Sequence, residues 1–262
     1  MDVKFNQISS KVTIKMKNLT YIMHRLANQP KEHMEVGVDL FENILRLATK
    51  SKFDIVRLKD LYQNRISKKD SICFSFDDGW QSDYTIAVPS LLKKNFLGTF
   101  FIITKQVGND GYLDWQQIIE MDKLGMEIGS HTASHSILTA LDRDEIKNEL
   151  STSKKTLENR LKRKVYGLSI PHGEYNRQIL KIAFEVGYQY VAISKPDINR
   201  SGTKIINRIS ITKQTQVEDF IQTINRPFTE LFNQKIKYYL RKIIKKSFGI
   251  SNYQKIRSWL IK

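Results

Sequence analysis

The sequence predicts an α/β protein built on a mostly parallel sheet or barrel, and two features of the chain carry this prediction. Short apolar segments of β-prone residues alternate with longer segments whose apolar residues recur at helical spacing. The connections between them are short throughout, which is typical of strands and helices that alternate around one parallel sheet. A chain of 262 residues with 40% hydrophobic residues is long enough for one large domain of this class or for two small ones.

The expected strands are short apolar runs bounded by polar or turn-forming residues. Residues 12–16 and 20–23 are the first such runs, and at least the second is expected to be a strand, with His24 at its carboxyl end. Further strands are expected at residues 53–56, 72–76, 98–103, 126–131, 165–170, 188–193 and 205–211.

The expected helices carry their apolar residues on one face. Residues 38–48 show the pattern well, because Phe41, Ile44 and Leu45 fall on one side of a helix. Gly125 is expected to end another helix that begins near Trp115. Further helices are expected at residues 58–62, 86–94, 142–161 and 176–186.

Two adjacent carboxylates, Asp77 and Asp78, follow the apolar run at residues 72–76. Neighbouring anions at the end of a buried strand are costly unless a cation or specific hydrogen bonds compensate them. Consecutive side chains of an extended chain point to opposite sides, so one carboxylate can hold a metal while the other faces a substrate. The alternative is an Asp-Asp-Gly turn on the surface.

Histidines gather at the ends of the predicted strands. The chain has five, and four of them, His24, His131, His135 and His172, stand at such ends. In parallel α/β architectures the carboxyl ends of the strands share one face. Two imidazoles four residues apart, with a carboxylate from a neighbouring strand, suit zinc or a similar divalent ion. His33, which lies in a polar loop, is expected to be structural or at the surface.

Composition narrows the class of protein. The single cysteine, Cys73, lies inside a predicted strand and is expected to fill the core, and one cysteine excludes an intrachain disulfide. Residues 1–17 contain no apolar run like that of a signal peptide, and no window reaches the roughly 18 apolar residues of a spanning helix. We therefore expect a soluble protein in the cytoplasm.

The last segment differs from the rest of the chain. Residues 231–262 contain nine Lys or Arg and no acid, although the net charge of the whole chain is only +16. Apolar residues from Phe232 to Ile244 fall on one face of a predicted helix. A basic amphipathic helix can lie on an anionic membrane or bind acidic partners, or it can pack on the domain with a solvated basic back. We expect residues 1–225 to form the main domain and residues 226–262 a basic helical tail. No nucleic-acid motif accompanies the charge, so nucleic acid is not an expected partner.

Three motifs resemble the signatures of the NodB-homology polysaccharide deacetylases. Ser75-Phe76-Asp77-Asp78-Gly79 and Ser130-His131-Thr132-Ala133-Ser134-His135 look like the first two, and Pro171-His172-Gly173 looks like the third, which is usually Pro-Tyr-Gly. The similarity runs from about Thr20 to Thr212, and the segments around His24 and Arg208 look like flanking pieces of the exopolysaccharide-modifying branch. The resemblance implies a deformed (β/α) barrel and metal-dependent removal of N- or O-acetyl groups from sugars.

The resemblance also implies roles for single residues. Asp78, His131 and His135 would bind the metal, which would be Zn²⁺, with Co²⁺, Ni²⁺ or Fe²⁺ as alternatives, and Asp77 would be the general base. Such a metal activates water and polarises the acetyl carbonyl.

The third motif, Pro171 to Gly173, would supply a backbone N–H at His172 to the oxyanion. Alternatively, His172 would act through its ring.

The chain departs from the family in two places. Many members have an arginine where this chain has Ser169, and the late Leu-x-His motif that supplies the general acid is absent, since no histidine follows His172. We expect His24 to be the acid and Arg208 to supply the positive charge beside Asp77.

These residues support two functions. The first is a metal-dependent deacetylase of an acetylated sugar or glycan, foremost an N-acetylated intracellular precursor that a membrane-lying tail can reach. The second is a catalytically impaired carbohydrate-binding protein on the same fold. The intact Asp77 favours the enzyme, because a binding module needs no base beside the metal ligands.

Overall fold

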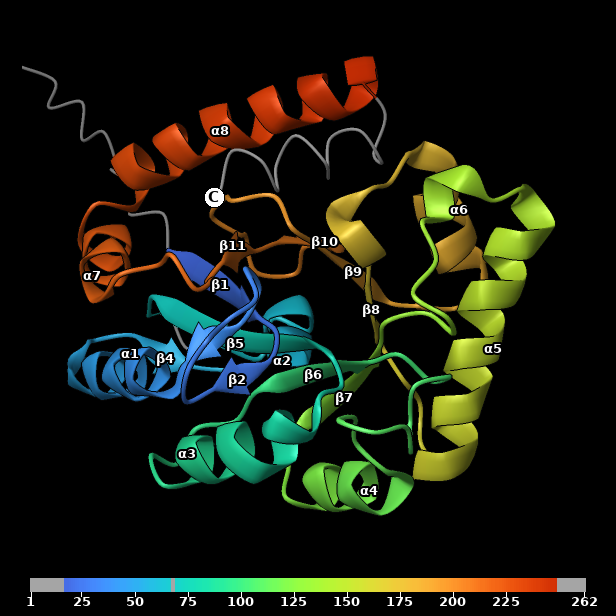
Figure 1. The fold of residues 1–262 in the computed structure, drawn as a ribbon, viewed down its shortest axis with the longest axis horizontal. Coiled ribbons are helices and arrows are strands. Elements are labelled where there is room, and N and C mark those ends of the chain that lie inside the picture. The colour runs from blue at the N-terminus through green and yellow to red at the C-terminus, as the bar shows by residue number, and fades with distance from the viewer. Residues whose placement is uncertain (1–16, 67–68, 249–262) are drawn as a thin grey trace, which may run out of the picture.

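The predicted parallel barrel is confirmed by a computed structural model of the chain, in which residues 17–66 and 69–248 are described. The strands form a nearly closed ring, and the helices surround it (Figure 1). The order of the strands around the ring is β10-β9-β8-β7-β6-β5-β1-β11, and each neighbouring pair is parallel. All carboxyl ends of these strands therefore open on one face.

The strands of the ring are short, as expected for a small barrel. Their bounds are β1 Asn18–Met23, β5 Ser71–Asp78, β6 Thr99–Ile102, β7 Glu127–Ser130, β8 Gly167–Ser169, β9 Tyr190–Ile193, β10 Ile205–Asn207 and β11 Ile209–Ser210. A further strand, β4 (Asp54–Ile55), pairs with β5, and β2 (Leu26–Ala27) pairs with β3 (Val36–Gly37) apart from the barrel.

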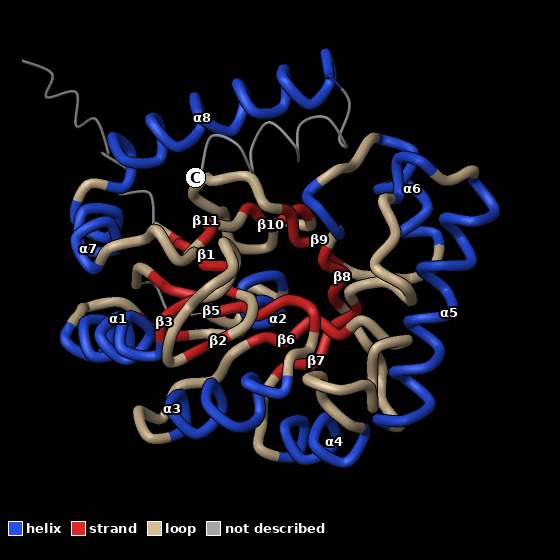
Figure 2. The backbone as a smooth tube through the Cα atoms, in the orientation of Figure 1, coloured by secondary structure: helices blue, strands red, loops and turns tan. Residues whose placement is uncertain are grey.

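Helices cover the outside of the ring (Figure 2), except α2 (Leu58–Tyr62), which lies behind its centre and contributes Leu58 and Leu61 to the hydrophobic cluster inside the barrel. The other α-helices are α1 Val38–Lys50, α3 Val88–Leu92, α4 Trp115–Lys123, α5 Arg143–Leu161, α6 Arg177–Glu185, α7 Val217–Asn225 and α8 Pro227–Phe248. A π-helical turn, η1 (Asp83–Ala87), precedes α3, so the helix expected at residues 86–94 begins earlier than predicted. Two 3₁₀ turns, η2 (Leu138–Ala140) and η3 (Pro171–Gly173), complete the elements.

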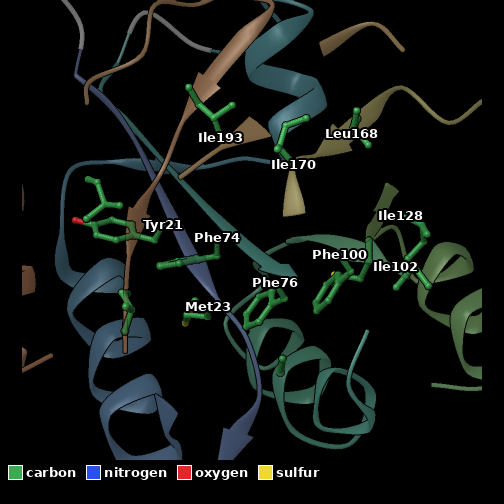
Figure 3. Close-up of a cluster of buried hydrophobic side chains, with 14 of the residues drawn as sticks. Tyr21, Met23, Phe74, Phe76, Phe100, Ile102, Ile128, Leu168, Ile170 and Ile193 are labelled. Carbon is green, nitrogen blue, oxygen red and sulfur yellow. The ribbon is translucent and has the colours of Figure 1, made fainter. Parts of the chain in front are cut away.

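Hydrophobic residues pack on both sides of the strands. Alternate residues of β5 point to opposite faces, so Phe74 and Phe76 pack outward among helix residues (Figure 3), whereas Cys73 points into the barrel. The interior cluster joins Cys73 to Phe101 and Tyr190 from strands that lie far apart around the ring. Cys73 is fully buried there, as expected for core filler.

Glycines in β7 and β8 leave room for these interior rings. A Cβ atom at Gly129 would lie 2.5 Å from the ring of Phe101, and one at Gly167 would lie 2.3 Å from the ring of Tyr190. These side chains fill the interior of the barrel below the carboxyl ends of its strands. A substrate therefore has room at the carboxyl ends, where the cleft lies.

The barrel closes where one strand was expected and two are found. The run at residues 205–211 was predicted as a single strand, and this is wrong, because it divides at Arg208 into β10, which pairs with β9, and β11, which pairs with β1. Asn199 fills the seam between β1 and β10. Its amide donates to Thr20 Oγ1 (3.1 Å) and to Asn207 O (2.9 Å), and its Oδ1 accepts from Asn207 N–H (2.8 Å).

Two expectations concern the ends of the chain. The apolar run at residues 12–16 lies outside the described residues. In the described part, no helix is long and apolar enough to cross a membrane. The predicted tail begins with α8, and the predicted boundary after residue 225 falls between α7 and α8.

Candidate active site

The backbone brings the two neighbouring carboxylates of β5 to the same face. Asp77 has the same orientation as Cys73 and Ser75, toward the barrel interior. Asp78 would point the other way in a fully extended chain, but it has φ +83°, and Gly79 follows with φ +81°. This turn carries the Asp78 side chain back over the end of the barrel, where both carboxylates line one cleft.

A folded loop after β7 presents the two histidines of the second motif. His131 N–H donates to Ile102 O (2.8 Å) and continues the ladder, whereas Thr132 and His135 have φ of +66° and +63°. Glu149 of α5 holds the loop by accepting hydrogen bonds from the backbone of residues 133 and 134 at 3.1 and 2.9 Å. The two imidazole rings consequently lie 4.8 Å apart between their centres.

Asp78, His131 and His135 converge on a common point. Asp78 Oδ1 lies 3.4 Å from His131 Nε2 and 3.6 Å from His135 Nε2, and the three donor atoms lie within 4.8 Å of one another. Asp78 Oδ1 is buried and has no hydrogen-bond partner among the described residues, while Trp80 Nε1 donates to the other oxygen at 3.1 Å. An unpartnered carboxylate oxygen aimed at two imidazole nitrogens fits a divalent cation.

Neighbours orient these donors and hold their charges. His131 Nδ1 lies 3.0 Å from Ser169 O, which can only accept, so Nδ1 carries a proton and Nε2, toward Asp78, is the nitrogen that can bind a cation. Burial opposes a charge on this ring, but Asp77 and Asp78 outweigh it and raise the pKa of His131. Burial opposes ionisation of Asp78, but the neighbouring His131 outweighs it and holds the pKa of this carboxyl below its usual range. Burial is the main cause that lowers the pKa of His135 to about 4, so its ring is neutral at neutral pH.

Arg208, which lies between β10 and β11, holds Asp77 across the end of the barrel. Its Nη1 and Nη2 donate to Asp77 Oδ1 and Oδ2 at 2.7 and 2.9 Å, and Ser169 Oγ donates to Oδ2 at 2.7 Å. Arg208 is fully buried and stacks 5.4 Å from the centre of the Phe101 ring. Burial alone would raise the pKa of Asp77, but the charge of Arg208 lowers it below the usual value, so the carboxylate is ionised.

His24 and His172 line the same cleft, which has a volume of about 450 Å³. The Nδ1 atom of His24 is buried and has no hydrogen-bond partner among the described residues, and burial lowers the pKa of this ring. His172 has φ +57°, and its ring lies 4.5 Å from that of His135, with Nε2 3.3 Å from His135 O. The third motif therefore contacts the second through the His172 side chain.

Several residues that the sequence did not single out also line the cleft. His33, expected to be structural or at the surface, faces the cleft together with Arg25 and Glu35 of the loop after β1. Tyr238 and Lys242 of α8 form part of its wall. The sequence carries no local signal for these contacts, because each depends on how a distant segment folds over the barrel.

Comparisons with known proteins agree with the geometry. A family model described as "Polysaccharide deacetylase" matches residues 64–191. The chain is 33% identical over 168 residues to the "Putative polysaccharide deacetylase YxkH" of Bacillus subtilis, a match that covers 64% of this chain and 59% of that protein. It is 34% identical over 121 residues to a "Peptidoglycan-N-acetylglucosamine deacetylase" of Bacillus cereus, covering 46% of this chain and 54% of that one.

A solved structure shares the fold over almost its whole length. The deacetylase PplD of Streptococcus pyogenes, solved in complex with acetate, matches with a TM-score of 0.74 and 25% identity, covering 80% of this chain and 98% of PplD. The matches to the two Bacillus proteins span only 59% and 54% of those proteins.

Proposed function

The chain carries a polysaccharide deacetylase domain, and on that premise we propose that it is a metal-dependent hydrolase that removes acetyl groups, foremost N-acetyl groups, from a sugar or glycan. The observation that carries this proposal is the unpartnered, buried Oδ1 of Asp78, which lies between the Nε2 atoms of His131 and His135. A buried carboxylate oxygen calls for a partner, and a divalent cation between the two imidazoles would supply one.

We assign Asp78, His131 and His135 as the ligands of a divalent cation, with Zn²⁺ as the first expectation. When bound, such an ion polarises an acetyl carbonyl and makes water a nucleophile near neutral pH. The residues themselves supply the geometry, because the Ser169 carbonyl sets the tautomer of His131 and Trp80 holds the second oxygen of Asp78.

Asp77 is the proposed general base. It is ionised and lies 3.7 Å from His131 Nε2, beside the proposed ligands. As water attacks the acetyl carbon, Asp77 would take its proton. The pairing with Arg208 orients the carboxylate but also lowers its affinity for a proton. Asp77 could therefore deprotonate only a water whose own pKa a bound cation has lowered.

His24 is the proposed general acid, which returns a proton to the leaving nitrogen as the C–N bond breaks. Burial lowers the pKa of His24, so its ring is neutral near pH 7 and has to receive that proton within the cleft. Asp77, which holds the proton taken from water, lines the same cleft. For the oxyanion we propose the backbone at His172, with the ring of His172 positioning His135.

We further propose an acetylated sugar or glycan as the substrate, no nucleic acid as a partner, and peripheral contact between residues 231–262 and a membrane. Acetylated glycans are supported by the relatives, one of which is described as acting on peptidoglycan N-acetylglucosamine. The cytoplasmic location stays a prediction from the sequence.

The second candidate is a sugar-binding protein that has lost catalysis. Two observations favour it: both oxygens of Asp77 are taken up by Arg208, and the late histidine of the family is absent. The two candidates differ in one measurable property, which is acetate release.

An acetate-release screen over N- and O-acetylated glycans with the Zn²⁺-loaded chain tests the proposal. Asp77→Asn is expected to lower kcat about 100-fold or more with metal content unchanged, while Asp110→Asn, on an exposed loop, serves as the matched control. His24→Ala is expected to lower kcat at unchanged metal content, and full kcat in this variant would remove the acid role. Absence of acetate from every substrate would leave the sugar-binding protein.

A further inference from the structure

Helix α8 exposes a continuous apolar stripe, formed by Phe228, Phe232, Ile236, Tyr239, Leu240 and Ile243. Each of these side chains is between 45% and 65% exposed. Their spacing places them along one side of the helix over about 22 Å. Large apolar side chains scattered singly on a surface need no explanation, but a row of six on one helix marks an interaction site.

The helix is held on the domain by a different face. Leu231 is buried, Lys235 Nζ pairs with Asp197 Oδ1 at 2.7 Å, and Lys242 Nζ lies 5.6 Å from the centre of the Tyr175 ring. Of the apolar stripe, Tyr239 also touches the domain, because its ring centre lies 5.7 Å from Lys195 Nζ, but the stripe as a whole stays about half exposed. In Figure 1 α8 follows α7 and runs along the edge of the molecule.

The charge of this region indicates what the stripe meets. Glu230 is the last acid of the chain, and nine Lys or Arg follow it. Lys237 is exposed beside the stripe. A second copy of this chain would bring a second basic helix against the first, whereas an anionic lipid surface complements both the apolar stripe and the basic residues.

We infer, resting on the deacetylase function proposed above, that α8 docks the protein on an anionic membrane surface and that the substrate is a glycan carried by that membrane. Tyr238 and Lys242 line the cleft and lie about a third and about a quarter of a turn, respectively, around α8 from the middle of the stripe. When the stripe lies at the lipid surface, this wall of the cleft lies next to it. A glycan anchored in the same surface can then enter the cleft without leaving the membrane.

Vesicle sedimentation of the full-length, Zn²⁺-loaded chain tests the docking. The triple variant Phe232→Ser, Ile236→Ser, Leu240→Ser is expected to bind phosphatidylglycerol-containing vesicles at least tenfold more weakly than the unmodified chain. Leu124→Ser removes an apolar side chain that is 42% exposed on another part of the surface and is the matched control. The unmodified chain is expected to bind pure phosphatidylcholine vesicles at least tenfold more weakly than anionic ones.

Acetate release separates the docking from the chemistry. The triple variant is expected to act on a soluble acetylated sugar within twofold of the unmodified chain, but at least tenfold more slowly on an N-acetylglucosamine-bearing lipid in anionic vesicles. Equal rates on the lipid-borne sugar overturn the inference, as does a chain that ignores anionic vesicles or a dimer in solution that the triple variant dissociates. Vesicle binding without acetate release from any substrate overturns the proposed function and leaves the docking intact.

Discussion

Unusual backbone angles mark the residues of the site. Asp78, Thr132, His135 and His172 have positive φ although none is glycine, and each belongs to one of the three motifs. Such conformations cost on the order of 1 kcal/mol each and persist where the surroundings enforce them. At Asp78 the benefit is visible, because an extended residue there would turn its carboxylate away from His131 and His135.

Replacing Arg208 by Gln tests how Asp77 is held. The buried carboxylate loses its charged partner, so we expect the free energy of unfolding at neutral pH to fall by about 3–5 kcal/mol. In the unmodified chain the pKa of Asp77 is lower in the folded state than its unfolded value of about 3.8. The ionised Asp77 therefore stabilises the fold fully above that unfolded value, and this stabilisation is lost as the pH falls through the folded pKa. Urea unfolding measures this change.

The same variant is expected to alter the pH dependence of catalysis. Without the guanidinium, burial raises the pKa of Asp77, so the acidic limb of the kcat/KM profile should move to higher pH. Arg143→Gln, which breaks an exposed ion pair with Glu185, is the matched control and should leave both stability and profile nearly unchanged. If the acidic limb of the kcat/KM profile stays at the same pH in Arg208→Gln, that limb reports a group other than Asp77.

Asp83 offers a second test at this scale. It is fully buried, neither carboxyl oxygen has a hydrogen-bond partner among the described residues, and burial raises its pKa well above the usual value. Because the folded pKa exceeds the unfolded value, unfolding releases a proton above about pH 4, and stability falls as pH rises toward the folded pKa. Asp83→Asn has no such proton, so its free energy of unfolding should decline less between about pH 5 and about pH 8.

Urea unfolding at several pH values, with both proteins in the same metal-loaded state, checks this expectation. Asp110→Asn, at an exposed position, controls for loss of a carboxylate as such. A variant whose decline with pH matches that of the unmodified chain would show that Asp83 is ionised in the folded protein.

Among the elements, the break between β10 and β11 decides how the barrel closes. Residues 205–211 are β-prone without interruption, so local pattern cannot reveal that the two halves pair with β9 and β1 on opposite sides of a seam. Arg208 sits at that break, and the break is what lets its side chain enter the barrel toward Asp77. The resemblance to the exopolysaccharide branch predicted the position of this charge, but residue spacing did not.

Asn199→Ala is expected to open this seam. The backbone N–H and C=O of Asn207 lose the side-chain partners they have in the unmodified chain, which should cost about 1–3 kcal/mol of unfolding free energy. Since Arg208 follows Asn207 directly, kcat should fall as well. Asn109→Ala, which removes exposed hydrogen bonds, is the control. Unchanged urea unfolding in Asn199→Ala would mean that the seam is held by other groups.

Two helices show what the apolar pattern of the sequence could and could not predict. Helix α7 was not predicted, although Phe220 and Ile224 recur at helical spacing and Gln216 and Asp219 form a capping box. The long amphipathic helix expected at residues 142–161 is found as α5, whose apolar pattern runs over 19 residues, whereas that of α7 runs over only nine.

At the scale of the whole molecule, the sequence predicted the ring of strands and the three motifs that meet at its carboxyl end. It could do so because parallel α/β topology brings the ends of the strands together, so that Asp78, His131 and His135 needed only to follow their strands. The hydrogen bond from Ser169 to Asp77 and the cleft wall formed by Tyr238 were not predictable, because both depend on packing between segments far apart in the chain.

The C-terminal helix links the site to the outside of the molecule. The sequence predicted its amphipathic pattern but not which face meets the domain. Leu231 and Tyr238 face the domain, while the apolar stripe stays exposed. We therefore propose that α8, though distinct in charge from the barrel, completes the cleft through Tyr238 and Lys242.

A metal titration of acetate release tests the metal-dependent chemistry most directly. Protein freed of metal by a chelator is titrated with Zn²⁺ while acetate release from an acetylated glycan is followed, alongside Asp78→Ala. We predict no activity at the start, a linear rise that stops at one equivalent, and no rise in the variant. Acetate release that is already complete before any Zn²⁺ is added, or that rises equally in Asp78→Ala, would contradict a cation held by Asp78, His131 and His135.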